Sequence, residues 1–134
     1  MRLLKKDSMT LGSSEDIVIV RRAVRTQLVS LGFGLVDQTK FVTAASELAR
    51  NAIDYAGGGT VEIGVVQEDR KTGMRLIFED HGPGIANIGL ALTDGYSSGG
   101  GMGLGLGGAR RLSHEFDLWS VPGEGTRVSI LRWK

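Results

Sequence analysis

One stretch of the chain combines a carboxylate and a carboxamide at the spacing of one helical turn. Glu47, Asn51 and Asp54 follow one another at steps of four and three residues, so on a helix they share one stripe. A carboxylate there can act as a general base, and an amide oxygen can bind a hard cation. The same spacing is common among plain surface residues, so the stripe alone leaves both interpretations open.

A second candidate site is a glycine-rich run from Gly99 to Gly108, in which Met102, Leu104 and Leu106 interrupt the glycines. Glycine adopts positive φ without a Cβ clash, so such a run lets several backbone N–H groups converge on a phosphate at the start of a helix. A flexible linker is the alternative, but linkers alternate glycine with serine rather than with large apolar residues. We therefore interpret the run as a phosphate-binding loop whose apolar side chains pack into a core.

The run matches neither of the two common phosphate-loop motifs. Gly103, Gly105 and Gly108 satisfy the dinucleotide pattern, but too few residues follow Gly108 for the alternating unit that this motif requires. The pattern G-x-x-x-x-G-K-[ST] is absent, because no glycine in the chain precedes a lysine. A different kind of nucleotide site is therefore indicated.

A third candidate site follows a predicted strand, Met74 to Phe78. The segment from Glu79 to Ile85 contains an acidic residue and then two glycines around a proline, which predicts a turn. A turn alone does not require the apolar Ile85, so we expect this loop to fold back over a pocket. His81 has only the distant His114 as a second imidazole, which disfavours a histidine metal site.

The spacing of the apolar residues predicts the elements that position these groups. In the first half we expect an edge strand at Ser8 to Leu11, a helix capped by Ser13 and closed by Gly32, and a helix capped by Asp37 and ended at Gly57 to Gly59. In the second half we expect a hairpin with a polar turn from Glu68 to Gly73, a short helix from Asn87 to Leu92, a helix from the glycine run to His114, and a hairpin from Phe116 to Trp133. This order predicts an α+β two-layer sandwich, in which helices cover one face of a mixed, mostly antiparallel sheet.

The composition limits the classes of function. The chain has 134 residues, 41% hydrophobic and 23% charged, which fits a single domain from 1 to 134. A net charge of +1 disfavours nucleic acid as a partner. The absence of cysteine excludes disulfides, thiolate zinc and a cysteine nucleophile. No apolar run or leader predicts a membrane segment, so we expect a cytoplasmic location.

Three of these segments resemble, in order and spacing, the N box and first two glycine boxes of the GHKL ATPases. They are Glu47-Leu-Ala-Arg-Asn51, Asp80-His-Gly-Pro-Gly84 and Gly101-Met-Gly-Leu-Gly-Leu106, and Gly125-Thr126 resembles the third glycine box. The resemblance implies the Bergerat fold, with ATP held between the helices and the sheet under a movable lid. It covers nearly the whole chain.

Within that superfamily, the chain is most similar to the RsbT-type switch kinases of bacterial stress modules. The similarity lies in Ser46 to Asn51, Glu79 to Gly84, Asp94-Gly-Tyr-Ser97 and Val121 to Thr126. It implies a serine/threonine kinase that phosphorylates STAS-domain scaffold or antagonist proteins and, once released, activates a downstream phosphatase or other output enzyme. A non-catalytic, ATP-responsive anti-sigma-type binding module is the alternative, although such a module would not need the Glu47 carboxylate.

The resemblance also suggests roles for single residues. Glu47 is the predicted base, Asn51 the ligand of Mg²⁺, and Asp80 the acceptor for the adenine amine. We expect Gly82 and Gly84 to allow close backbone approach, and Thr126 to support the adenine contact. The other predicted nucleotide contacts are Ile85, Gly101, Met102, Gly103, Leu104, Gly105 and Leu106. A lysine common in GHKL lids is missing, so Mg²⁺, backbone N–H groups and Arg110 or Arg111 must meet the phosphate charge.

One further surface feature leaves two interpretations open. The exposed face of the first predicted helix carries Arg21, Arg22 and Arg25. Such a run is either a solvated face or a surface for a partner protein. Arg50, inside the N box, points away from both Glu47 and Asn51 on a helix, and the sequence assigns it no role.

Overall fold

The computed structural model describes residues 1–92 and 106–134. Its elements follow in this order: β1 (Arg2–Leu11), α1 (Ser14–Ser30), α2 (Leu35–Ala56), β2 (Gly59–Glu68), β3 (Lys71–Asp80), α3 (Ile88–Ala91), α4 (Leu106–Arg111), β4 (Glu115–Val121) and β5 (Gly125–Trp133).

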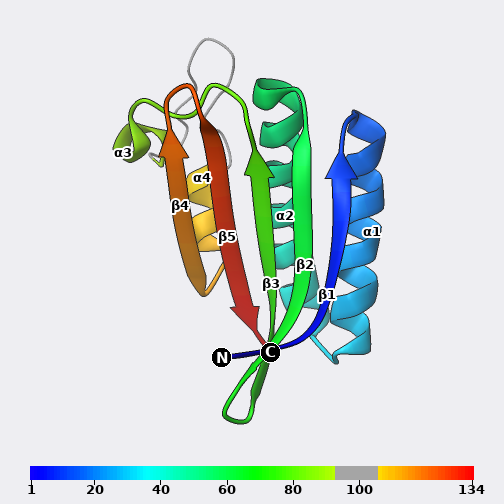
Figure 1. Ribbon diagram of the computed structural model, residues 1–134. Coiled ribbons are helices and arrows are strands. Elements are labelled where there is room, and N and C mark those ends of the chain that lie inside the picture. Colours follow the sequence, from blue (N-terminus) through cyan, green and yellow to red (C-terminus); the bar gives the residue numbers. More distant parts are fainter. Residues whose placement is uncertain (93–105) are drawn as a thin grey trace.

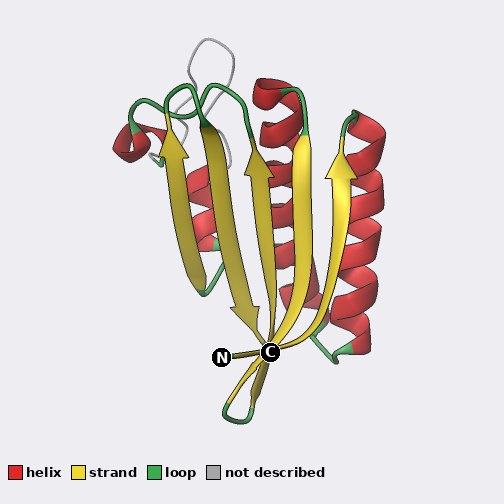
Figure 2. Ribbon diagram, in the orientation of Figure 1, coloured by secondary structure: helices red, strands yellow, loops and turns green. Residues whose placement is uncertain are grey.

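The strands form one sheet in the order β1-β2-β3-β5-β4. All four described pairings are antiparallel, so the sheet is not mixed as the sequence allowed. Figure 1 shows α1, α2 and α4 on one side of the sheet, and Figure 2 shows the same two layers by type of element. The prediction of an α+β sandwich with helices on one face is confirmed.

The core lies between the helices and the covered face of the sheet. Helix α2 buries Phe41, Ala45 and Leu48 along one stripe, and these residues belong to one apolar cluster with Leu76 and Phe78 of β3. Helix α1 adds its own stripe, which consists of Ile17, Val20, Val24 and Leu28. Burial of the Val, Leu, Ile and Phe side chains among them, at about 1.5 to 3 kcal/mol each, holds the two layers together. The apolar spacing in the sequence predicted both stripes.

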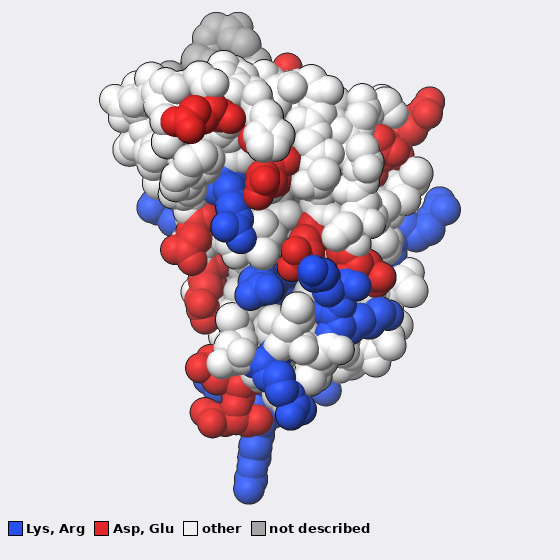
Figure 3. Space-filling view, viewed as in Figure 1, with Lys and Arg blue, Asp and Glu red and all other residues white. Residues whose placement is uncertain are grey.

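The opposite face of the sheet is covered by no described helix. Figure 3, drawn from that side, shows acidic and basic side chains spread over the strands. They include the cross-strand pairs of Arg75 with Glu62, at 3.7 Å, and of Arg127 with Glu79, at 3.9 Å. At these distances, and with the Arg127–Glu79 pair half-exposed, such pairs contribute little to stability.

Three predicted element boundaries were wrong. Strand β1 has ten residues rather than the four predicted, because its pairing with β2 extends through exposed residues that show no alternation. Strands β2 and β3 leave only Asp69 and Arg70 between them, so the turn is shorter than Glu68 to Gly73. Helix α4 ends at Arg111, before His114, whose Nδ1 instead accepts a hydrogen bond from the Trp133 N–H at 2.8 Å.

The helix caps correspond to the sequence signals in one case and not in the other. At the start of α1, the Asp16 carboxylate accepts hydrogen bonds from the N–H groups of Gly12 and Ser13, at 2.7 and 3.2 Å. Helix α2, however, is capped by Gly34 rather than by Asp37. Asp37 lies in its first turn, and its carboxylate pairs with Arg132 at 2.6 Å. Asp37 therefore binds a residue distant in the chain, Arg132, and does not act as the helix cap that the sequence predicted.

Candidate functional site

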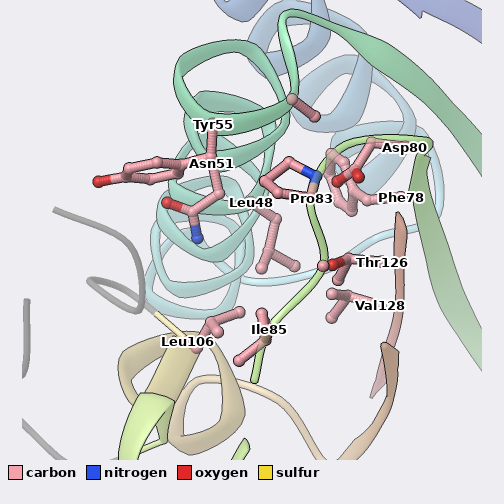
Figure 4. Close-up of a pocket in the computed structure, with 12 residues that line it drawn as sticks. Leu48, Asn51, Tyr55, Phe78, Asp80, Pro83, Ile85, Leu106, Thr126 and Val128 are labelled. Carbon is pink, nitrogen blue, oxygen red and sulfur yellow. The ribbon is translucent and has the colours of Figure 1, made fainter. Parts of the chain in front are cut away.

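A pocket lies between α2, the end of β3, the start of β5 and the first residue of α4. Its lining consists of Leu48, Asn51, Tyr55, Ala56, Phe78, Asp80, Pro83, Gly84, Ile85, Leu106, Thr126 and Val128. Figure 4 shows Asn51 and Tyr55 projecting from α2, with Asp80, Thr126 and Val128 across from them. Six of the predicted site residues therefore meet here: Asn51, Asp80, Gly84, Ile85, Leu106 and Thr126.

The pocket has apolar walls and a few polar groups. Leu48, Phe78 and Val128 contribute carbon surface, whereas Asn51, Asp80 and Thr126 contribute hydrogen-bonding atoms. This combination is typical of sites for small organic ligands, because the walls pack against a flat ring while the polar groups fix its orientation. The arrangement suits an aromatic ligand with a polar edge.

Two glycines bring the loop after β3 close to its neighbours. A Cβ at Gly82 would collide with Ala56 at the end of α2, and one at Gly84, where φ is +75°, would collide with the Val121 carbonyl oxygen. The Asp80 Oδ1 accepts a hydrogen bond from the Gly82 N–H at 3.0 Å, which stabilises the turn. Gly84 lines the pocket, whereas Gly82 packs against α2 and is not part of the lining. Both glycines thus allow close approach to protein atoms.

A hydroxyl network lies beside Thr126, and its central residue, Ser120, was not predicted from the sequence. The Ser120 hydroxyl is 2.9 Å from the Thr126 hydroxyl, accepts the Ile85 N–H at 2.8 Å and contacts the Gly125 carbonyl oxygen at 3.0 Å. One signal could have identified it. Phe116, Leu118 and Ser120 alternate along β4, so Ser120 is the polar residue on a stripe that otherwise packs into the core.

The predicted base lies one helical turn before Asn51. Glu47 is half-buried on α2, and it is not part of the pocket lining. Its carboxylate forms no hydrogen bond or ion pair with another residue of the ranges 1–92 and 106–134. Asp54, the third member of the stripe, is exposed. The carboxylate of Glu47 therefore retains its acceptor capacity beside the pocket.

Most of the glycine run lies outside the described residues. This holds for Gly101, Met102, Gly103, Leu104 and Gly105, and for the segment 94–97 that is similar to the switch kinases. Leu106 is described, and it begins α4 with only 2% of its surface exposed. Its side chain lines the pocket, as expected for an apolar residue of this run that packs into a core.

Arg132 connects α4 to α2 on the side of the core away from the loop after β3. Its guanidinium donates to the Asp37 carboxylate at 2.6 and 3.2 Å and to the Leu112 carbonyl at 2.8 Å. The hydrogen bond from Arg132 is the main reason why the pKa of Asp37 is lowered. We call Asp37, Arg132 and Leu112 the α2–α4 clamp. It fixes the end of the helix that starts at the pocket.

Two further groups have shifted pKa values. Burial, with the charge of Asp54 as the second cause, raises the pKa of Tyr55. Burial, with Arg132 as the second cause, lowers the pKa of His114. Neutral His114 is the form whose Nδ1 can accept the Trp133 N–H.

The described residues contain no group of three or more His, Cys, Asp or Glu side chains that could hold a metal ion. Asn51 is the predicted ligand at the pocket. A single amide oxygen fits Mg²⁺, which keeps several waters and is usually bound through one or two side chains together with substrate phosphates.

Among the helices of residues 1–92 and 106–134, none is long and apolar enough to cross a membrane.

Comparisons with known proteins found a matching family model, a similar sequence and a similar fold. Residues 36–134 match the family model described as histidine kinase-, DNA gyrase B- and HSP90-like ATPase. The chain is 48% identical over 118 residues to the serine/threonine-protein kinase RsbT of Bacillus subtilis (strain 168), and the match covers 88% of this chain and 89% of that protein. The structure is similar to that of the mycobacterial sensor histidine kinase MprB, with a TM-score of 0.54, 20% identity and coverage of 96% and 97% of the two chains. At that identity, the structural likeness supports the fold alone.

Proposed function

The chain belongs to the histidine kinase-, DNA gyrase B- and HSP90-like ATPases, the GHKL family, and from this we propose that it is a serine/threonine protein kinase that uses ATP. The observation that carries the proposal is the convergence of Asn51, Asp80 and Thr126 in one pocket. The 48% identity to a named serine/threonine kinase over most of both chains supports the same activity. We treat residues 1–134 as one catalytic domain, because its helices and sheet share a core cluster.

Asp80 is the residue to which we assign recognition of adenine. An ionised carboxylate can only accept hydrogen bonds, so it favours the exocyclic amine of adenine over the carbonyl oxygen of guanine. The apolar side chains of Leu48, Ile85 and Val128 line the same pocket and can pack against the faces of the ring. The pocket therefore suits ATP better than GTP.

Phosphate binding is assigned to three kinds of group. Asn51 would hold Mg²⁺, which neutralises phosphate charge and keeps several waters. The backbone N–H groups of the glycine run that precedes α4 would bind phosphate oxygens at a helix start. Arg110 and Arg111 lie in the last turn of α4 and can supply positive charge in place of the missing lid lysine.

Glu47 is the residue that we assign as general base. It would accept the proton of a serine or threonine hydroxyl while that oxygen forms a bond to the γ-phosphorus and the bond from this phosphorus to ADP breaks. Such a base must have free lone pairs and be close to the phosphates. Glu47 satisfies the first condition among the described residues, and it lies one turn from Asn51.

We further propose that the substrates are STAS-domain scaffold or antagonist proteins, and that release from them lets the kinase activate a downstream phosphatase or another output enzyme in the cytoplasm. The docking surface that we assign is the exposed side of α1. Arg21 and Arg22 are exposed there, beside Val18 at 55% and Ile19 at 49% exposure. Arg25, the third arginine of the predicted face, is half-buried and donates a hydrogen bond to the Gln38 side chain at 3.3 Å. Positive charge next to exposed apolar surface suits an acidic protein partner.

A transfer assay tests the proposed function. The chain is incubated with ATP labelled at the γ-phosphate, Mg²⁺ and STAS-domain proteins of the same genome. We expect label on the STAS protein that survives acid, because a phosphoserine or phosphothreonine ester is acid-stable and a phosphohistidine is not. If ATP binds but no STAS protein is labelled, the kinase assignment fails and an ATP-responsive anti-sigma-type binding module becomes the better interpretation.

A further inference from the structure

We propose that Ser120 is a positioning residue that turns the Thr126 hydroxyl into a hydrogen-bond acceptor on the pocket floor and thereby adds to the selection of a 6-amino purine. The proposal rests on the ATP site assigned above. It concerns three side chains in a row across three strands. Ser120 of β4 pairs with Thr126 of β5, and Thr126 pairs with Asp80 of β3.

The number of hydrogens at Ser120 determines the direction of each bond. Its Oγ has three partners within 3.0 Å, namely the Ile85 N–H, the Gly125 carbonyl oxygen and the Thr126 hydroxyl. A hydroxyl carries one hydrogen. The Ile85 N–H can only donate, and the Gly125 carbonyl can only accept. The single hydrogen of Ser120 therefore belongs to Gly125, and Thr126 donates to Ser120.

The opposite assignment is less favourable. If Ser120 donated to Thr126, its oxygen and the carbonyl oxygen of Gly125 would lie 3.0 Å apart with no hydrogen between them. A partly buried carbonyl would then lose a partner that the observed distance supplies. The chosen assignment satisfies all three contacts at once.

This direction decides what Thr126 offers to a ligand. Its hydrogen is used by Ser120, so only lone pairs of Thr126 remain for the pocket, which Thr126 and Asp80 both line. The ionised Asp80 carboxylate is also an acceptor. Two neighbouring acceptors favour an amino group, or a water that donates to them, and disfavour a carbonyl oxygen. Ser120 thus influences base selection without lining the pocket itself.

The test compares ATP with inosine triphosphate, which carries a carbonyl in place of the 6-amino group. Dissociation constants are measured by calorimetry with the full chain. In Ser120→Ala the Thr126 hydroxyl can rotate and donate to the carbonyl, so we expect the preference for ATP over inosine triphosphate to fall by about tenfold, the size of one redirected hydrogen bond. Ser120→Thr keeps the oxygen and should restore the preference.

Two controls separate this role from general damage to the sheet. Ser129→Ala makes the same change on the neighbouring strand β5. Ser129 pairs with Asp117, whereas Ser120 pairs with Thr126, so this variant should leave the preference unchanged. In the ligand-free protein, exchange of the Ile85 amide hydrogen should become faster in Ser120→Ala, because that N–H loses its acceptor. If Ser120→Ala does not fold, the nearly isosteric Thr126→Val removes the acceptor instead and should reduce the preference similarly.

The possible outcomes distinguish the two proposals. If the unaltered chain prefers ATP and Ser120→Ala keeps that preference, the role of Ser120 is overturned while the ATP site stands. If the unaltered chain binds both nucleotides equally or binds neither, the adenine site itself is overturned, and the role of Ser120 with it.

Discussion

Two carboxylates on α2 differ in whether a positively charged side chain is bound to them. Asp37, in the first turn, accepts hydrogen bonds from Arg132 at 2.6 and 3.2 Å, and this pairing lowers its pKa. Glu47, on the part of the helix that leads to the pocket, has no such partner among residues 1–92 and 106–134. One helix therefore carries a carboxylate that is held by a cation and a carboxylate that is left available.

The difference indicates how the molecule separates stability from chemistry. Asp37 belongs to the α2–α4 clamp, in which Arg132 is only 8% exposed, so removing a partner there would leave buried groups without hydrogen bonds. Glu47 contributes no described contact of this kind, so its removal should cost little stability.

The largest expected effect is on catalysis at Glu47. In Glu47→Gln, phosphate transfer should fall by a factor of about 10² to 10⁴, the usual contribution of a general base, while ATP affinity and thermal stability stay near the parental values. Single-turnover transfer and calorimetry measure the two quantities. Asp54→Asn, at the third position of the same stripe, is the matched control and should retain transfer. A parental rate in Glu47→Gln with a lost rate in Asp54→Asn would instead assign the base to Asp54.

The second effect is on folding stability at the clamp. Arg132→Met removes the donors to Asp37 and Leu112 and should lower the free energy of unfolding by about 2 kcal/mol, measured by urea denaturation. Arg127→Met makes the same change on the same strand, where the ion pair to Glu79 is exposed and 3.9 Å long. It should cost less than about 0.5 kcal/mol. Equal losses in the two variants would contradict the clamp.

The third effect is on nucleotide affinity at the pocket. Asp80→Ala should weaken ATP binding at least about tenfold, because a hydrogen bond to a charged group contributes about 1.5 to 3 kcal/mol. Glu79→Ala is the neighbouring control, since the Glu79 side chain pairs with Arg127 and is not part of the pocket lining. Calorimetry with ATP and GTP measures both variants. Unchanged ATP affinity in Asp80→Ala would remove Asp80 from adenine recognition.

The smallest expected effect is on the pH dependence of stability. The pKa values of His114 and Asp37 are both lowered from their ordinary values of 6.5 and 3.8, so each group stabilises the fold only while deprotonated. Stability should fall as the pH drops below 6.5 through the lowered pKa of His114, and again below 3.8 through that of Asp37. Urea denaturation over this range measures both steps. His114→Gln should remove the first step and Asp37→Asn the second, and a step that persists in its own variant has another source.

The sequence predicted those parts of the fold that depend on local spacing. The stripes of α1 and α2, the hairpin of β2 and β3 and the short helix after Asn87 are confirmed, because apolar periodicity and glycine positions select an element within a few residues. That Asn51, Asp80 and Thr126 lie in one pocket could be predicted only from the similarity of their segments to known motifs. Their spacing along the chain gives no information about this contact.

Other features were decided by the tertiary structure alone. Asp37 was interpreted as a cap because caps are local, yet its partner Arg132 is 95 residues away. Ser120 carried no motif, and its bond to Ile85 spans 35 residues. Hydrogen bonds and ion pairs of this kind depend on which strand and helix ends are brought together, and no short-range pattern encodes that. Local patterns and motifs in the sequence were therefore sufficient for the order and type of most elements, for the family and for the candidate chemistry. The packing of the sheet against α2 and α4 decided which carboxylate is paired and which hydroxyl faces the pocket as an acceptor, because burial and hydrogen bonding act between residues distant in the chain.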